Sequence, residues 1–68
     1  MIKEGTRWSY KGKTYEVMQA SGMRVKDPDS GVWHDGVSYQ PVEGSVEGYV
    51  FVRQQKDFLA KFKPTEQE

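Results

Sequence analysis

Turn-forming residues interrupt this chain about every eight to twelve positions, which leaves room for short strands but not for long helices. Lys11-Gly12 predicts a tight turn, because glycine readily adopts the positive φ that a two-residue hairpin loop needs. Residues 27–31, Asp-Pro-Asp-Ser-Gly, predict a second turn, and Asp35-Gly36 predicts another two-residue hairpin loop. This spacing of turns indicates a small all-β protein.

The segments between the turns carry strand patterns. Trp8 and Tyr10 fall on one face of the first segment, and Tyr15 and Val17 fall on one face of the second. We expect strands over residues 6–10, 13–19, 23–26, 32–34, 37–39 and 49–53. Residues 40–48 contain one proline and two glycines without a clear period, and they predict a loop.

The pattern changes near the C-terminus. Phe58 and Phe62 are four positions apart and share one face of a helix, which predicts a short helical turn over residues 57–62. Pro64 is expected to stop this turn, and residues 65–68 are expected to form a frayed tail.

The chain has 68 residues, so it is expected to bury only about 60% of its unfolded surface in a single core. We expect one small β-barrel domain over residues 1–64, with an inserted hairpin at residues 23–39. The absence of cysteine excludes disulfides, thiolate zinc sites and thiol nucleophiles. The sequence shows neither a membrane span nor a signal peptide, and a cytoplasmic protein is expected.

The charges are balanced in number but segregated along the chain. Residues 1–26 carry six Lys or Arg and two acids, residues 27–49 carry five acids and no Lys or Arg, and residues 50–65 return to a positive balance. Such a pattern is typical of a solvated surface whose signs pair on folding. It also fits an acidic lobe that steers a binding partner.

Catalysis and metal binding find little support in this sequence. His34 is the single histidine, and Asp35 beside it would point to the opposite face of a strand and could not orient the imidazole. One histidine without cysteine makes a poor zinc site. Asp27-x-Asp29 lacks the later Glu of a calcium loop, where Ser38 falls instead. We expect no enzyme activity, no metal and no cofactor.

Nine aromatic residues exceed what so small a core can hide. The expected core consists of Trp8, Tyr15, Val17, Val37, Val50, Val52, Phe58 and Phe62. Some members of a second set are then expected at the surface: Tyr10, Trp33, Tyr39, Tyr49 and Phe51. Exposed Tyr and Trp often only cover the ends of a barrel, but together with Arg they are also typical anchors of a binding surface.

Residues 7–17, Arg-Trp-Ser-Tyr-Lys-Gly-Lys-Thr-Tyr-Glu-Val, combine an aromatic, a Tyr-Lys-Gly turn and a Tyr-Glu-Val strand. Three later elements follow in order: Val37-Ser38-Tyr39, Phe51-Val52-Arg53, and Phe58 with Phe62. With these elements the chain resembles the small bacterial and phage-encoded proteins of the domain of unknown function numbered sixteen fifty-three. It departs from them at Gln54, where they usually carry proline, and in an insertion over residues 23–36. The resemblance implies an SH3-like barrel of about five antiparallel strands and a phage-type accessory protein, with no established activity.

The leading hypothesis is a non-catalytic binding module that docks on a host protein through an acidic, aromatic hairpin. Trp33 and His34 would form its contact tip, with Tyr39 and Tyr49 at its base, and Asp35 is a further expected binding residue of the hairpin. One alternative is an oligomeric protein that sequesters a nucleotide or another small ligand. Another is a barrel that binds single-stranded nucleic acid, and the residues proposed for this surface are Tyr10, Tyr49, Arg7, Lys11, Lys13 and Arg53. The zero net charge counts against the last alternative.

Overall fold

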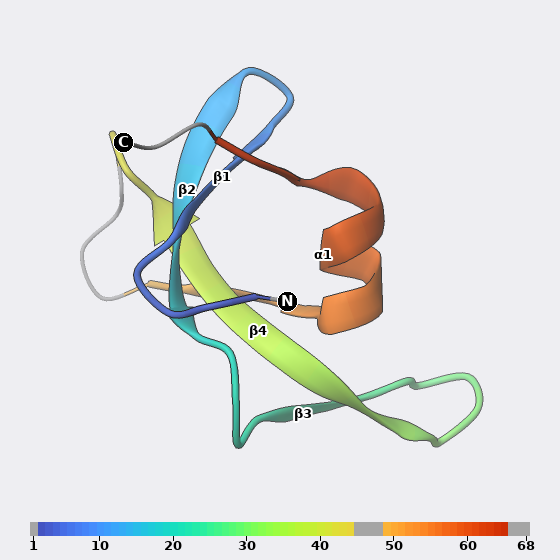
Figure 1. Cartoon of the computed structure of the whole chain (residues 1–68). Helices are drawn as coiled ribbons and strands as arrows, with labels where there is room; N and C mark the ends of the chain where they lie inside the picture. Colours follow the sequence, from blue (N-terminus) through green and yellow to red (C-terminus); the bar gives the residue numbers. More distant parts are fainter. Residues whose placement is uncertain (1, 45–48, 66–68) are drawn as a thin grey trace.

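The computed structural model describes residues 2–44 and 49–65, which form one antiparallel sheet and one short helix (Figure 1). The elements are β1 (Arg7–Tyr10), β2 (Lys13–Gln19), β3 (Arg24–Lys26), β4 (Trp33–Pro41), β5 (Phe51–Gln54), α1 (Gln55–Lys61) and β6 (Lys63–Pro64). The prediction of a small, mainly β protein with a short C-terminal helix is confirmed. The more specific SH3-like barrel stays a prediction.

Strand β4 is the centre of the sheet. Its residues 38–41 pair with β2 and its residues 36–39 pair with β5, so this part of β4 is flanked on both edges. Its first residues, 33–35, pair with β3. Beyond β2 the sheet continues through β1 to β6, and α1 joins the two outer strands β5 and β6 along the chain.

The first hairpin forms as its sequence predicts. Lys11 and Gly12 both have positive φ, 52° and 80°, as the two central residues of a type I′ turn require. The turn fixes the register of β1 against β2 so that Trp8 lies opposite Tyr15. These two rings therefore point to the same face of the sheet, the face that α1 covers.

The prediction of a hairpin loop at Asp35-Gly36 is wrong, because β4 runs through both residues without a turn. Gly36 is needed for close packing instead. A Cβ atom there would lie 2.7 Å from Val25 Cγ2 and 3.2 Å from Met23 Cγ, and only glycine leaves room for both side chains. The chain turns earlier, over residues 27–32 between β3 and β4, so Trp33 and His34 do not form the tip.

The core combines residues of β1, β2 and β4 with two phenylalanines of the C-terminal segment. Its buried apolar members are Ile2, Trp8, Val17, Val37, Tyr39, Phe58 and Phe62, with Tyr15 packed against them. The Phe58 and Phe62 rings stack with centroids 4.2 Å apart, and Trp8 meets Phe58 edge-on at 5.1 Å. The i, i+4 pair of phenylalanines thus places one face of α1 on the sheet.

The prediction that Val50 and Val52 belong to the core is wrong, since their side chains are 51% and 49% exposed. The register explains the error. Arg53 pairs with the buried Val37 and Phe51 pairs with the buried Tyr39, and paired residues share a face of a sheet. Successive strand residues alternate between the faces, so Val52, between Phe51 and Arg53, points away from the core. Val50 lies just before β5, outside the paired residues.

The predicted boundaries at the C-terminal half differ from those observed. The helix begins at Gln55, two residues before the predicted turn, and Gln40 and Pro41 belong to β4 rather than to the predicted loop. Thr65 N–H donates to the Arg7 carbonyl, so pairing with β1 continues past β6. Residues 45–48 of the predicted loop and 66–68 of the predicted tail lie outside the described residues.

Within the described residues, no helix has the length and apolar character needed to cross a membrane.

Candidate functional site

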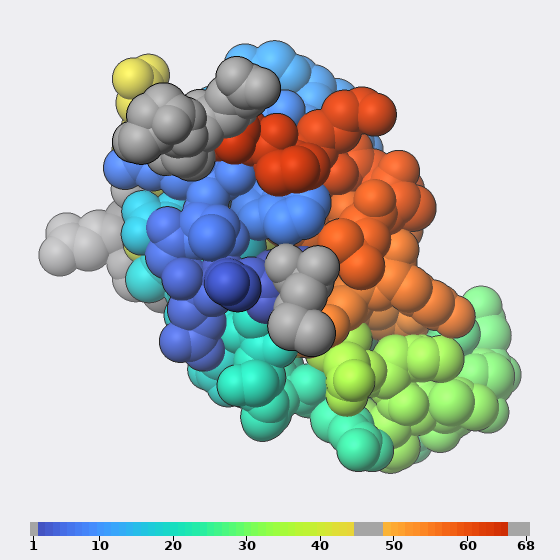
Figure 2. Space-filling model, in the orientation of Figure 1, coloured from blue at the N-terminus to red at the C-terminus, as the bar shows by residue number. Residues whose placement is uncertain are grey.

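The hairpin of β3 and the first part of β4, residues 24–35, projects away from the rest of the molecule (Figures 1 and 2). It contributes no residue to the core. Trp33 is 55% exposed there, and the adjacent Val32 is equally open to solvent. An indole that the fold leaves exposed on a projecting hairpin is available to a binding partner.

The loop of this hairpin is held by its own hydrogen bonds. Asp27 N–H donates to the Val32 carbonyl at 2.8 Å, and Gly31 N–H donates to the Asp27 carbonyl at 2.7 Å. The Asp27 carboxylate accepts from Asp29 N–H at 2.9 Å, and this bond lowers the pKa of Asp27 below its usual value. Asp27 therefore acts as a structural residue of the loop, with its carboxylate turned to the backbone.

The predicted tip residues Trp33 and His34 and the predicted binding residue Asp35 lie together at the start of β4, beside the loop. The ammonium of Lys26 lies 5.8 Å from the centre of the Trp33 ring, at cation–π distance. Asp35 is exposed and its carboxylate lies 3.7 Å from Arg24 Nε. His34 is half-buried and pairs with Val25 across the hairpin. Trp33 is thus the main apolar group here, and charged side chains surround it.

A second cluster gathers around Arg53 on the core side of β5. The Arg53 guanidinium donates to the Tyr39 hydroxyl at 2.8 Å and to the Asp57 carboxylate at 2.6 Å. Its central carbon lies 5.4 Å from the ring centres of both Tyr10 and Phe62. The hydrogen bond that Arg53 donates to Asp57 raises the pKa of Arg53, while Arg53, and then Lys61, lower the pKa of Asp57. This arrangement stabilises the junction between β5 and α1.

Tyr39 does not lie at the surface, as the predicted docking role requires, because only 5% of it is exposed. Its ring packs against the stacked rings of Phe62 and Phe58, at 5.1 and 5.4 Å, where the C-terminal segment covers it. Tyr10 is half-buried in the same cluster. Tyr49 is strongly exposed but precedes β5 instead of adjoining the hairpin. The predicted residues therefore divide among three places: the hairpin, the Arg53 cluster and the segment before β5.

The Arg53 cluster opens to solvent through a small cavity of about 200 Å³, lined by Tyr10, Tyr15, Tyr39, Phe51, Arg53 and Phe62. Sites for small ligands commonly occupy about 300–1,000 Å³. The Lys11 ammonium also lies 5.3 Å from the Tyr10 ring centre. The opening thus offers an aromatic surface with two cations, of which Arg53 already bonds to Asp57.

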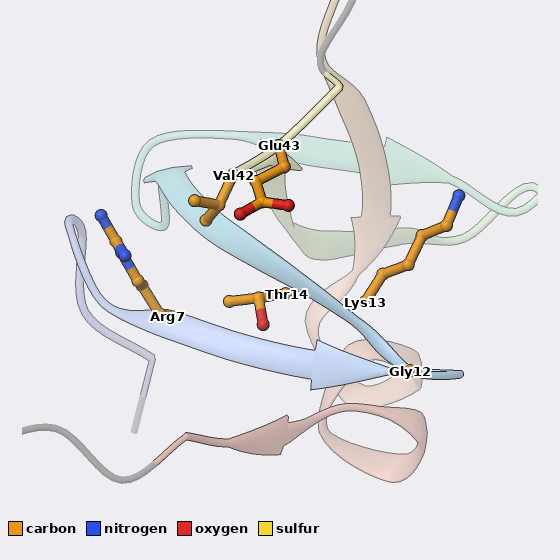
Figure 3. A pocket seen from close by; sticks show the side chains of 6 residues that line it. All are labelled: Arg7, Gly12, Lys13, Thr14, Val42 and Glu43. Carbon is orange, nitrogen blue, oxygen red and sulfur yellow. The ribbon is translucent and has the colours of Figure 1, made fainter.

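A larger depression of about 380 Å³ lies over the outer face of β1 and β2, and sequence reasoning did not indicate it. Figure 3 shows the Glu43 carboxylate above Thr14, whose hydroxyl points away from it, with Arg7 and Lys13 at the two sides. Val42 N–H donates to the Thr14 carbonyl and ties the loop to β2. Both basic and acidic side chains line this depression, as is typical of an ordinary polar surface between a loop and a sheet.

A surface that the sequence analysis predicted only in part lies at residues 49–52. Tyr49, Val50, Phe51 and Val52 are four consecutive apolar residues, and each is about half exposed or more. The signal was present in the sequence, because an apolar run without alternation is unusual in a strand with one solvent-facing side. The sequence analysis assigns Val50 and Val52 to the core and names Tyr49 and Phe51 as candidates for the surface.

Among the described residues, no group of three or more His, Asp or Glu side chains is placed to hold a metal ion. The chain matches no protein-family model, no curated protein and no solved structure. The resemblance noted over residues 7–17 and the three later elements stays a prediction.

Proposed function

We propose that this protein is a non-catalytic binding module that docks on a protein partner through the β3–β4 hairpin, with Trp33 as its anchor. The observation that carries this function is the exposed indole on a projecting hairpin that contributes nothing to the core. Tryptophan is prominent among residues that dominate binding energy at interfaces. Val32 beside it enlarges the apolar area that a partner could cover.

The hairpin is organised before any partner arrives. Its ladder pairs Lys26 with Trp33 and Arg24 with Asp35, and the loop bonds of Asp27 close its end. A surface that is already ordered loses less conformational entropy on binding than a flexible loop does. This supports a docking role for the hairpin over a role as a passive connection.

The charges around Trp33 indicate the chemistry of the partner. Asp29 and Asp35 are exposed on the hairpin, and Lys26 lies against the indole. An apolar pocket that admits Trp33, with basic groups at its rim, would complement this surface. The resemblance over residues 7–17 and the three later elements supports a phage-type accessory protein that acts on a host protein in the cytoplasm.

The test is affinity capture of partners with the wild type and two variants. Trp33→Ala removes the anchor, and Met18→Ala is the matched control because Met18 is an exposed apolar residue of β2 outside the hairpin. We expect Trp33→Ala to weaken the captured complex at least about tenfold while Met18→Ala leaves it unchanged. A partner that binds Trp33→Ala and wild type equally well would remove the hairpin from the interface.

The second candidate function is binding of a nucleotide or of single-stranded nucleic acid at the small cavity of the Arg53 cluster, beside Tyr10. The observation in its favour is the pair of cations, Lys11 and Arg53, near the Tyr10 ring. Such binding would fall steeply with salt, because phosphate contacts release counterions. A thermal shift with a nucleotide, or a salt-dependent affinity for an oligonucleotide that Lys11→Ala reduces, would support it. No thermal shift with a nucleotide, together with no binding of an oligonucleotide at low salt, would exclude this function.

A further inference from the structure

The outer strands of this sheet differ in how they are protected from pairing with another chain. Strand β3 has three residues, two of them Arg24 and Lys26, and β6 consists only of Lys63 and Pro64. Short length, positive charge and proline are the usual means of blocking an exposed sheet edge. Strand β5 is also short, at four residues, but its first half has neither charge nor proline, and there Phe51 and Val52 follow Tyr49 and Val50.

Strand β5 is also open along one side. It pairs with β4 alone, through Phe51 opposite Tyr39 and Arg53 opposite Val37, and no other described strand pairs with it. An edge strand presents unpaired backbone N–H and C=O groups along its free side. Apolar side chains that are about half exposed surround these groups, so the free side of β5 suits pairing with another strand.

The sequence of this segment fits a second copy of the same chain. Val50-Phe51-Val52 reads the same in both directions, and antiparallel pairing about a two-fold axis at Phe51 places valine opposite valine and Phe51 opposite its mate. The same register places Tyr49 opposite Arg53, at positions that share a face of the sheet. A guanidinium beside a phenol ring is a favourable contact.

The charges of the paired segment are compatible with this symmetric contact. Arg53 is the single charged residue of residues 49–54, and it already pairs with Asp57 of its own chain at 2.6 Å. Within residues 49–54, the register therefore places no like charges opposite each other. We propose that the free edge of β5 pairs with β5 of a second copy, in antiparallel register centred on Phe51, to form a two-fold symmetric dimer.

The contact is a single pair of strands, so the dimer is expected to be weak and to dissociate on dilution. Sedimentation over an about hundredfold range of concentration should show the mass rising from that of the 7.8 kDa chain toward twice that value. Val52→Lys should shift the dissociation constant at least tenfold, because it places a charge opposite Val50 of the mate. Trp33→Ala is the control and should leave the mass unchanged, which separates this proposal from the function of the hairpin.

A charge pair tests the register itself. Val50→Glu and Val52→Lys each insert an unpaired charge, whereas the double variant places glutamate opposite lysine twice across the axis. We expect the double variant to dimerise at least tenfold more tightly than either single variant. Val50 and Val52 are both half exposed, so all three variants should fold, and circular dichroism would check this.

A cysteine at the axis gives an independent test. The natural chain has no cysteine, and Phe51→Cys introduces one that would directly face its mate. Directly opposed strand residues have Cα atoms about 4.5–5.5 Å apart, within the range of disulfides. Leu59→Cys on α1 is the matched control, because Leu59 is as exposed as Phe51. Mild oxidation should give disulfide dimers of Phe51→Cys and leave Leu59→Cys monomeric.

Each outcome decides the proposal. A wild type that stays monomeric at the highest concentration overturns it, as does a dimer that Val52→Lys leaves intact. If the double variant with Val50→Glu and Val52→Lys dimerises no more tightly than the single variants, the register centred on Phe51 is overturned. Growth of assemblies larger than a dimer also contradicts it, because a two-fold contact closes on itself.

Discussion

The two halves of strand β4 place their aromatic residues in opposite environments. Tyr39 in the second half is buried, whereas Trp33 in the first half is among the most exposed large side chains. Both residues lie on one continuous strand, so strand propensity does not separate them. The difference shows that burial here depends on what flanks the strand.

Residues 36–39 pair with β5, residues 38 and 39 also pair with β2, and α1 covers the Tyr39 ring. Residues 33–35 pair with β3 only, and no described element covers Trp33 from the core side. We interpret the second half of β4 as the structural half and the first half as the part that presents a binding residue.

The largest expected effect is in the structural half. Tyr39→Ala removes a ring packed against Phe58 and Phe62 and should destabilise the protein by about 3–5 kcal/mol. Tyr39→Phe keeps the ring and loses only the bond from Arg53, so it should lose about 1 kcal/mol. Urea denaturation measures both. A loss below about 1 kcal/mol for Tyr39→Ala would place Tyr39 outside the core.

The junction between the halves should be the next most sensitive position. Gly36→Ala places a Cβ atom 2.7 Å from Val25 Cγ2 and should destabilise the protein by about 1–3 kcal/mol. Val25→Ala removes that methyl group, so the double variant should be less destabilised than the sum of the two single changes. Additive losses in thermal denaturation would show that this contact does not set the requirement for glycine.

Acid should weaken the structural half through Asp57. Its pKa is lowered in the folded protein by Arg53, so its stabilising contribution is complete above the unfolded pKa of about 3.9 and is lost as the pH falls through the folded value. We expect wild-type stability to fall from about pH 4 downward, and to fall less in Asp57→Asn. Denaturation midpoints between about pH 5 and pH 2 measure this. If the stability of the wild type and of Asp57→Asn fell equally with pH, the Arg53–Asp57 pair would not be stabilising.

The smallest effect on stability should come from Trp33→Ala. The indole is exposed and adds nothing to the core, so the change should stay within about 0.5 kcal/mol while the loss of partner binding is large. The same urea experiment provides the comparison with Tyr39→Ala. A destabilisation of several kcal/mol would mean that Trp33 supports the fold.

Local signals in the sequence predicted much of the fold. Alternation placed Trp8 and Val17 in the core, Lys11-Gly12 gave the first turn, and the Phe58–Phe62 spacing indicated the helix. These features depend on neighbours within a few residues, which a sequence shows directly. The exposure of Trp33 was expected for the same reason, because its segment offered little core of its own.

The errors arise where distant segments meet. Asp35-Gly36 has the composition of a turn, but the packing of Val25 explains the glycine, and the sequence does not show which strand approaches it. The register of β5 against β4 places Val52 on the face away from the core, and Val50 is exposed just before the strand begins. The burial of Tyr39 depends on α1 closing over β4, a contact between residues about twenty positions apart.

Backbone hydrogen exchange tests most directly whether the hairpin is held separately from the core. Asp27 N–H bonds to the Val32 carbonyl at 2.8 Å in the hairpin, and Val17 N–H bonds to the Thr6 carbonyl at 2.9 Å beside the core. We predict that Val17 exchanges only through global unfolding, and that Asp27 exchanges at least about tenfold faster through local opening of the hairpin. Equal protection of the two amides would show one cooperative unit and contradict the division of β4.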